Sequence, residues 1–154
     1  MSIERVREYL KEFDMDTKIR EFSVSSATVA LAAEALGCEP ARIAKSLAFK
    51  TDSGCIMVVA AGDARVDNKK YKAQFGLKAK MLTVDETYEM TGHMVGGVCP
   101  FALPEGVRVY FDESLKRFET VFPACGSTNS AIELTIAELE RLVPSAEWVS
   151  VCKI

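Results

Sequence analysis

The chain has no long hydrophobic run, only five prolines and a single histidine. No stretch of about 20 apolar residues occurs among its 154 residues, which excludes a membrane-spanning helix. The N-terminus is charged from Glu4 onward, so we expect no secretory signal. With 49% hydrophobic and 27% charged residues, we expect a cytoplasmic protein of one domain, residues 1–154, that folds without disulfides.

The usual ligands of a metal centre are also missing. The five cysteines contain no C-x-x-C pair, and His93 is the one histidine, so the closely spaced Cys and His of a zinc site are absent. We therefore expect no metal and no cofactor. An odd number of widely separated cysteines is typical of free, buried thiols in a reducing compartment.

Positive charge is concentrated in one segment. The formal net charge is −3, yet residues 65–80 contain six basic residues and one acidic residue, a local charge of +5. Asp67 is placed to cap a helix in this segment, with Tyr71 and Phe75 on its buried side. The segment is either a solvated helix face or a surface that meets a phosphate backbone.

Helices and strands follow one another without strict β-α-β alternation. This order predicts an α/β chain of the mixed α+β class, with one mixed sheet and helices packed around it. Helices are predicted at 3–13 (capped by Ser2), 25–36 (opened by Ser25 or Ser26), 67–75, 83–92 and 135–143, and strands at 18–22, 43–51, 55–61, 107–111, 121–123, 132–134 and 148–151.

Lys45 is the unusual residue of the strand predicted at 43–51. Alternation places it on one face with Ile43, Leu47 and Phe49, whereas the other face is small, which indicates that another element packs closely there. A lysine among large apolar side chains is either solvated at an exposed strand end or directed into a pocket. In a pocket, its ammonium would bind an anion or polarise a carbonyl.

Two loops have compositions typical of ligand contacts. Residues 92–101 (GHMVGGVCPF) are rich in glycine, whose backbone approaches a ligand closely and presents amide N–H groups. This loop matches neither the dinucleotide-binding motif nor the phosphate loop of nucleotide triphosphatases. Residues 123–130 (PACGSTNS) form a small polar turn that, taken alone, is equally typical of a plain surface turn.

Together these segments resemble the YbaK/EbsC family, stand-alone relatives of the editing domain inserted in bacterial prolyl-tRNA synthetases. The resemblance is carried by Ile43-Ala44-Lys45-Ser46-Leu47 after the turn from Gly37 to Pro40, by Gly96-Gly97-Val98-Cys99-Pro100, and by Gly126-Ser127 before Ile132-Glu133-Leu134. It extends over residues 20–143 in the family's order and spacing. It implies a barrel-like curved, mixed β-sheet surrounded by helices.

The same resemblance implies an enzyme that hydrolyses the ester between a wrong amino acid and its tRNA. The implied substrate is a small amino acid such as Ala, Cys or Ser on tRNA(Pro). The implied partners are the mischarged aminoacyl-tRNA and a prolyl-tRNA synthetase, with no DNA and no membrane. Water attacks the ester without a metal, a cofactor or a protein nucleophile.

The resemblance also assigns roles to individual residues. Lys45 is the expected catalytic lysine, and the backbone of Gly96 and Gly97, in the G-x-x-x-P loop that ends at Pro100, positions the aminoacyl carbonyl. The expected substrate-binding residues are Phe22, Ser25, Thr28, His93, Val98, Cys99, Pro100, Gly126, Ser127 and Asn129. Lys69, Lys70 and Lys72 of the basic segment are expected to contact acceptor-stem phosphates.

Departures from the family pattern leave alternatives open. Phe22 stands where well-studied members carry a tyrosine, Cys99 stands where YbaK carries a serine, and residues 126–129 differ from the Gly-Lys-Arg-Gly type, so no particular amino acid is predicted. His93 either lines the pocket or caps the preceding helix. The other functional alternatives are a non-catalytic module that binds aminoacyl-adenosine, tRNA or a synthetase, and a thiol-dependent enzyme that uses Cys99 or Cys125.

Overall fold

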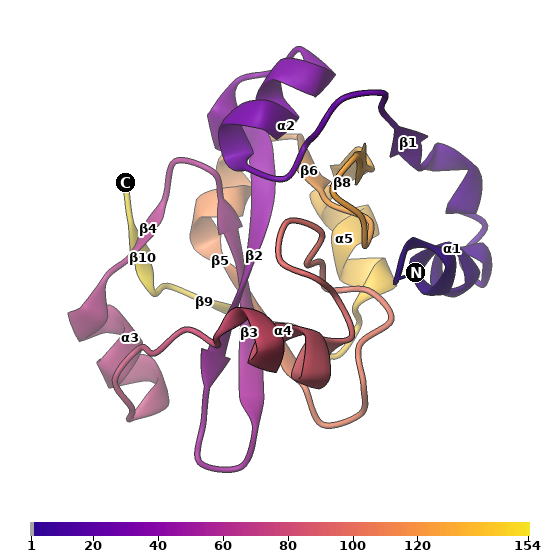
Figure 1. Ribbon diagram of the computed structural model, residues 1–154. Coiled ribbons are helices and arrows are strands. Elements are labelled where there is room, and N and C mark those ends of the chain that lie inside the picture. The colour runs from indigo at the N-terminus through magenta and orange to yellow at the C-terminus, as the bar shows by residue number, and fades with distance from the viewer. Residues whose placement is uncertain (1) are drawn as a thin grey trace.

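A computed structural model describes residues 2–154 (Figure 1). The helices are α1 (Ser2–Lys11), α2 (Val29–Leu36), α3 (Asn68–Phe75), α4 (Val84–Thr91) and α5 (Ile136–Leu142), with 3-10 turns η1 (Asp16–Lys18), η2 (Pro40–Arg42) and η3 (Glu113–Arg117). The strands are β1 (Arg20–Glu21), β2 (Ile43–Lys50), β3 (Cys55–Ala61), β4 (Arg65–Val66), β5 (Arg108–Asp112), β6 (Thr120–Pro123), β7 (Ser130–Ala131), β8 (Leu134–Thr135), β9 (Glu147–Val149) and β10 (Cys152–Lys153). None of the helices within residues 2–154 is long and apolar enough to cross a membrane.

A six-stranded mixed sheet lies at the centre, in the order β8-β6-β2-β3-β5-β9. β2 and β3, the strands predicted at 43–51 and 55–61, form an antiparallel hairpin whose register runs from Ala44 opposite Ala61 to Lys50 opposite Cys55. β2 also pairs in parallel with β6, β3 with β5, and β5 with β9. The helices surround this sheet (Figure 1), which confirms the predicted mixed α+β class.

Helix α3 covers one face of the hairpin. Phe49 of β2 lies 5.0 Å, between ring centroids, from Tyr71 of α3, and Phe75 of α3 lies 4.8 Å from Tyr110 of β5. Tyr71 is 1% exposed, so the two predicted anchors of the basic helix do pack on the sheet. Because side chains alternate along a strand, Lys45 shares this face with Phe49.

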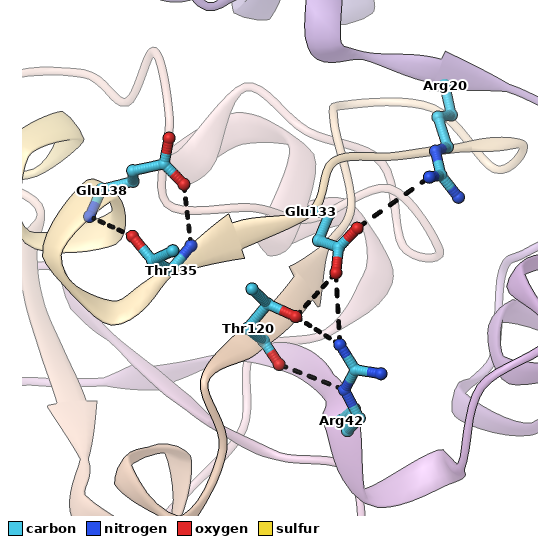
Figure 2. Close-up of polar contacts among 6 residues, drawn as sticks. All are labelled: Arg20, Arg42, Thr120, Glu133, Thr135 and Glu138. Carbon is cyan, nitrogen blue, oxygen red and sulfur yellow. Dashed lines mark hydrogen bonds and ion pairs between the residues drawn. The ribbon is translucent and has the colours of Figure 1, made fainter.

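Local hydrogen bonds set the helix ends where the sequence places them. In the capping box of α5, the Thr135 N–H donates to Glu138 Oε1 at 2.9 Å and the Glu138 N–H donates to Thr135 Oγ1 at 3.1 Å (Figure 2). Thr83 and Glu86 form the same box at α4. Asp67 caps α3 by accepting from two backbone N–H groups.

The start of α2 differs from the prediction. Its N-cap is Thr28, whose hydroxyl accepts from the Leu31 N–H, and neither Ser25 nor Ser26 caps the helix. The reason is a long-range contact, since both serine hydroxyls lie toward the Thr128 carbonyl oxygen, at 3.5 Å and 3.4 Å.

Three predicted strands are shorter or divided. The first contains only Arg20–Glu21, because Lys18 belongs to the 3-10 turn η1. The strand predicted at 132–134 is replaced by β7 and β8, which lie on either side of Ile132 and Glu133. The last predicted strand, 148–151, ends at Val149 in β9, because the Val151 N–H donates to Asp112 Oδ1 at 2.9 Å, and β10 follows as a separate strand.

Glu133 joins elements at the edge of the sheet (Figure 2). Its Oε2 accepts from Thr120 Oγ1 at 2.7 Å and from Arg42 Nη2 at 3.3 Å, and its Oε1 lies 3.9 Å from Arg20 Nη2. Exposed ion pairs contribute little one at a time, but this carboxylate is shared by three partners. The network holds η2, and with it the start of β2, next to β6.

Candidate functional site

Part of β2 has an open edge. β6 pairs with residues 43–44, and the Leu82 N–H donates to the Ala48 carbonyl at 3.1 Å, but within residues 2–154 no strand pairs with residues 45–47 on this side. The backbone groups of alternate residues point to the same side of a strand. Because the Ala48 carbonyl points to this edge, the N–H and C=O of Ser46 point there too.

A cavity of about 300 Å³ lies at this open edge. Its walls are residues 43–48 of β2, residues 26–29 and Ala32 around the start of α2, Met81, Leu82 and Thr87, the loop residues Val95, Gly96 and Val98, and Phe122, Ala124, Ser130 and Ala131. Among these lining residues Lys45 is the only charged one. The site is therefore a mostly apolar pocket with one cation in its wall.

The small side chains of β2 have two different neighbours. Ala48 packs with Leu82, as the sequence predicts for a face covered by another element. Ser46 lines the cavity instead. Sequence reasoning missed Ser46, because a serine between alanines is an ordinary strand residue and its surroundings depend on the fold.

Lys45 lines the pocket, but its ammonium is hydrogen-bonded to a residue outside the lining. Nζ donates to the carbonyl oxygen of Ala64, in the turn after β3. Burial lowers the pKa of Lys45 below its ordinary value, an effect that nearby Cys152 and Asp63 oppose. The structure thus places the half-buried Lys45 ammonium against a carbonyl that does not line the cavity.

The glycines of the loop allow close packing behind the pocket. A Cβ at Gly96, whose φ is +97°, would lie 3.0 Å from the Ala27 Cβ, and a Cβ at Gly97 would lie 2.7 Å from the Ser127 backbone nitrogen. The Gly97 N–H donates to the Met94 carbonyl at 2.9 Å, whereas no hydrogen bond among residues 2–154 occupies the Gly96 N–H. Gly96 lines the cavity, and Gly97 packs on the turn at 126–127.

His93 lies behind the loop and is fully buried, so it neither lines the cavity nor caps α4 from solvent. Its Nε2 lies 2.8 Å from the Phe101 carbonyl oxygen and its Nδ1 lies 2.8 Å from Ser2 Oγ, which is 2.6 Å from the Gly126 carbonyl oxygen. Burial lowers the pKa of His93, so the imidazole is neutral at neutral pH. The residue links the two site loops to the first residue of α1.

The cysteines near the loop are buried thiols. Cys99 and Cys125 are both fully buried, and neither lines the cavity. Burial raises the pKa of Cys99 to about 12 and raises the pKa of Cys125 well above its ordinary value. A thiol that does not ionise near neutral pH is a poor nucleophile, which argues against a thiol-dependent enzyme.

The other residues expected at the site are divided between the pocket and its surroundings. Thr28 and Val98 line the cavity, whereas Phe22, Ser25, Pro100, Gly126, Ser127 and Asn129 do not. The Asn129 side chain donates to the Phe22 carbonyl at 2.9 Å, and the Phe22 N–H donates to the Asn129 carbonyl at 2.7 Å, so this pair ties two loops together.

The three lysines of the basic helix lie outside the cavity. Lys69, Lys70 and Lys72 are exposed on α3, and Lys70 Nζ donates to the Cys152 carbonyl at 2.9 Å. Within residues 2–154 no group of three or more His, Cys, Asp or Glu side chains is arranged to hold a metal ion.

Comparison with known proteins identifies the family. The model of the aminoacyl-tRNA editing domain matches residues 24–142. The chain is 53% identical to the uncharacterized protein YwhH of Bacillus subtilis, over 99% of this chain and 98% of YwhH. It is 30% identical, over 66% of this chain and 63% of the relative, to EbsC of Enterococcus faecalis, which is named a Cys-tRNA(Pro)/Cys-tRNA(Cys) deacylase.

A longer relative and a relative of known structure support the same family. A proline–tRNA ligase of Thermosipho melanesiensis is 30% identical over 88% of this chain, which spans 24% of the ligase. The crystal structure of a trans-editing enzyme for prolyl-tRNA synthetase superposes with a TM-score of 0.89 at 29% identity, over 99% of this chain and 98% of that one. The family match and this structural similarity confirm the resemblance that the sequence carries: the chain belongs to the aminoacyl-tRNA editing domain family, among the relatives of YbaK and EbsC.

Proposed function

We propose that this protein is a trans-editing hydrolase that removes a small, wrongly attached amino acid from aminoacyl-tRNA. The observation that carries the proposal is the cavity of about 300 Å³ at the open edge of β2, with Lys45 and Gly96 in its wall, in a chain of the editing-domain family. The names of EbsC and of the trans-editing relative favour tRNA(Pro) as the carrier and prolyl-tRNA synthetase as a partner.

In this proposal the pocket selects by size. β2 contributes the small side chains of Ala44 and Ala48 to the lining, and larger side chains such as Leu82 and Phe122 bound the cavity, so a small aminoacyl group fits and a larger one is excluded. The unoccupied N–H of Gly96 is available to the ester carbonyl oxygen, as a rigid backbone donor whose orientation is fixed before the reaction.

Lys45 supplies the positive charge. When the aminoacyl ester enters, a substrate oxygen replaces the Ala64 carbonyl as the acceptor of the ammonium. Water then attacks the carbonyl carbon, and negative charge develops on the carbonyl oxygen, where the Gly96 N–H and the ammonium stabilise it. The ester C–O bond breaks, the free amino acid leaves with the oxygen of the water, and the departing tRNA oxygen takes up the proton that this water releases.

A deacylation assay tests this function. Purified protein is offered tRNA(Pro) charged with Ala, Cys, Ser or Pro, and tRNA(Ala) charged with Ala or Ser, with EDTA present throughout. We expect turnover of at least one mischarged tRNA, and a loss of about 100-fold or more in Lys45→Ala, as is typical when one group that stabilises a transition state is removed. Lys50→Ala, an exposed lysine of the same strand, is the matched control and keeps full activity.

Two results would contradict the proposal. Full activity of Lys45→Ala would remove the lysine from the chemistry. Absence of turnover on every charged tRNA, with the protein folded, would favour the non-catalytic module, and a pull-down of tRNA and synthetases would then identify what it binds.

A further inference from the structure

The pocket contains one hydroxyl without a partner. Five hydroxyl side chains line the cavity: Ser26, Thr28, Ser46, Thr87 and Ser130. Four of them are engaged with the protein: Ser26 with the Thr128 carbonyl, Thr28 with the Leu31 N–H, Thr87 with the Thr83 carbonyl at 2.8 Å, and Ser130 with Ser127 Oγ at 2.6 Å. Ser46 Oγ is buried and has no hydrogen-bond partner within residues 2–154.

Such a group is unusual in a folded protein. Buried polar side chains nearly always find a partner, and those that do not are concentrated where a ligand completes the hydrogen bonding. Ser46 also directs its backbone N–H and C=O to the open edge of β2. Ser46 therefore lines the cavity and carries a buried hydroxyl that no group within residues 2–154 satisfies.

The charges around the pocket restrict the kind of chemical group that the Ser46 hydroxyl can bind. No carboxylate lines the cavity, and the single cation, Lys45, is anchored to the Ala64 carbonyl. A cationic group placed deep in this wall would lose its hydration without gaining a counter-charge. A neutral group that both donates and accepts a hydrogen bond matches the Ser46 hydroxyl, and the alanines on either side, Ala44 and Ala48, leave room only for a short side chain.

We propose that Ser46 is a specificity-determining residue whose hydroxyl exchanges a hydrogen bond with the side-chain hydroxyl of a seryl group, so that the site prefers seryl-tRNA to alanyl-tRNA. This inference rests on the proposed editing function and names the amino acid that it removes. A site built to hydrogen-bond a substrate hydroxyl rejects the analogue that lacks it, because its own polar group is then left buried and unpaired.

The first experiment compares two charged forms of one tRNA. Wild type, Ser46→Ala and Ser53→Ala are assayed on the same tRNA(Pro) carrying Ser or Ala, and kcat/KM is measured for each. We expect wild type to prefer the seryl form and Ser46→Ala to lose about tenfold of that preference, the usual effect of one hydrogen bond. Its activity on the alanyl form does not fall, because alanine at this position leaves no unpaired hydroxyl. Ser53→Ala, an exposed serine in the β2–β3 turn, keeps the wild-type ratio.

A binding measurement separates this inference from the catalytic proposal. Hydrolysis-resistant 3′-amide analogues, seryl- and alanyl-aminoadenosine, are titrated into the same variants by calorimetry. Tighter binding of the seryl analogue by wild type, lost in Ser46→Ala, supports the specificity role of Ser46. This holds even if no charged tRNA is hydrolysed, because the lack of hydrolysis would overturn only the editing function. Equal binding of both analogues by wild type, or an equal loss of both in Ser46→Ala, overturns the specificity role.

Discussion

At the scale of single residues, Gly97 shows how a missing side chain shapes the site. It packs directly on the turn at 126–127, where an added Cβ would lie 2.7 Å from the Ser127 nitrogen and 2.9 Å from the Gly126 carbonyl carbon. Both obstacles are backbone atoms, which cannot rotate away. Gly97 therefore fixes the distance between the two loops behind the pocket.

We predict that Gly97→Ala lowers the free energy of unfolding by about 1–3 kcal/mol, the usual cost of overpacking, and also lowers kcat/KM for deacylation. Gly106→Ala is the control: a Cβ there meets no atom within 4 Å, so it adds backbone strain at a φ of +96° and leaves the loops in place. Urea unfolding and the deacylation assay measure both effects. Unchanged stability and activity in Gly97→Ala would contradict this prediction and show that the turn at 126–127 moves to accommodate the added Cβ.

Lys45 and Ser46 differ in how far the sequence predicts them. Strand alternation alone makes Lys45 conspicuous, because a charge among large apolar side chains needs an explanation. Ser46 is conspicuous only in the fold, since a serine beside alanines is an ordinary strand residue until its hydroxyl is found buried without a partner. Whether a polar group is satisfied depends on contacts distant in sequence.

At the scale of elements, α1 braces both loops of the site. Ser2, its first residue, lies at hydrogen-bond distance from His93 and from the Gly126 carbonyl, and the Arg5 guanidinium donates to the Gly92 carbonyl. The N-terminal helix is thus connected to the glycine-rich loop and to the polar turn at the same time. The sequence predicts α1 as a helix but assigns it no part in the site.

The buried His93 makes this bracing depend on pH. Burial lowers its pKa in the folded protein, and Arg5 adds to the effect, while the unfolded chain keeps the ordinary value of about 6.5. As the pH falls below about 6.5, the unfolded state binds a proton that the folded state does not, so stability is lost in this range and is retained above it.

We predict that the urea midpoint of the wild type falls between pH 7.5 and pH 5.5, and that His93→Gln reduces this fall. The glutamine keeps polar atoms near Ser2 and Phe101 but does not titrate. Carboxylates with lowered pKa values, such as Glu86 at about 2, titrate below this window and do not interfere. Equal falls in both proteins would assign the pH dependence to another group.

The limits of the elements are predictable where their causes are local. The capping boxes of Thr83 and Thr135 lie within four residues of chain, so the sequence places both helix starts correctly. The start of α2 is misplaced because the hydroxyls of Ser25 and Ser26 lie toward Thr128, about a hundred residues away in the chain. Tertiary contacts of this kind have no local signature.

At the scale of the whole molecule, the pocket is a product of topology. β2 is open at 45–47 because β6 pairs with only two of its residues and the segment at Leu82 joins it further along. The family resemblance predicts the fold and the elements that surround the site. It does not predict this gap in the sheet, which depends on the register of strands about eighty residues apart.

The distribution of charge over the whole molecule indicates from which side a tRNA would approach. The basic segment 65–80 contains the exposed lysines of α3 and ends at Lys80, next to Met81 in the wall of the cavity. The rest of the chain has a net charge of −8 and repels a phosphate backbone. A tRNA whose acceptor end enters the pocket would therefore meet attraction mainly on the side of α3.

We predict that Lys69→Glu, Lys70→Glu and Lys72→Glu together weaken tRNA binding at low salt and reduce the slope of log affinity against log salt by about 0.7–0.9 for each phosphate that the variant no longer neutralises. The preference among amino acids stays unchanged, because these lysines lie outside the cavity. Lys11→Glu, Lys18→Glu and Lys116→Glu together, three exposed lysines outside this segment, give the same change in net charge and serve as the control. Binding is measured by filter retention across a salt series. If the triple variant binds as tightly as wild type at low salt, the helix is a solvated face and the tRNA approaches from another side.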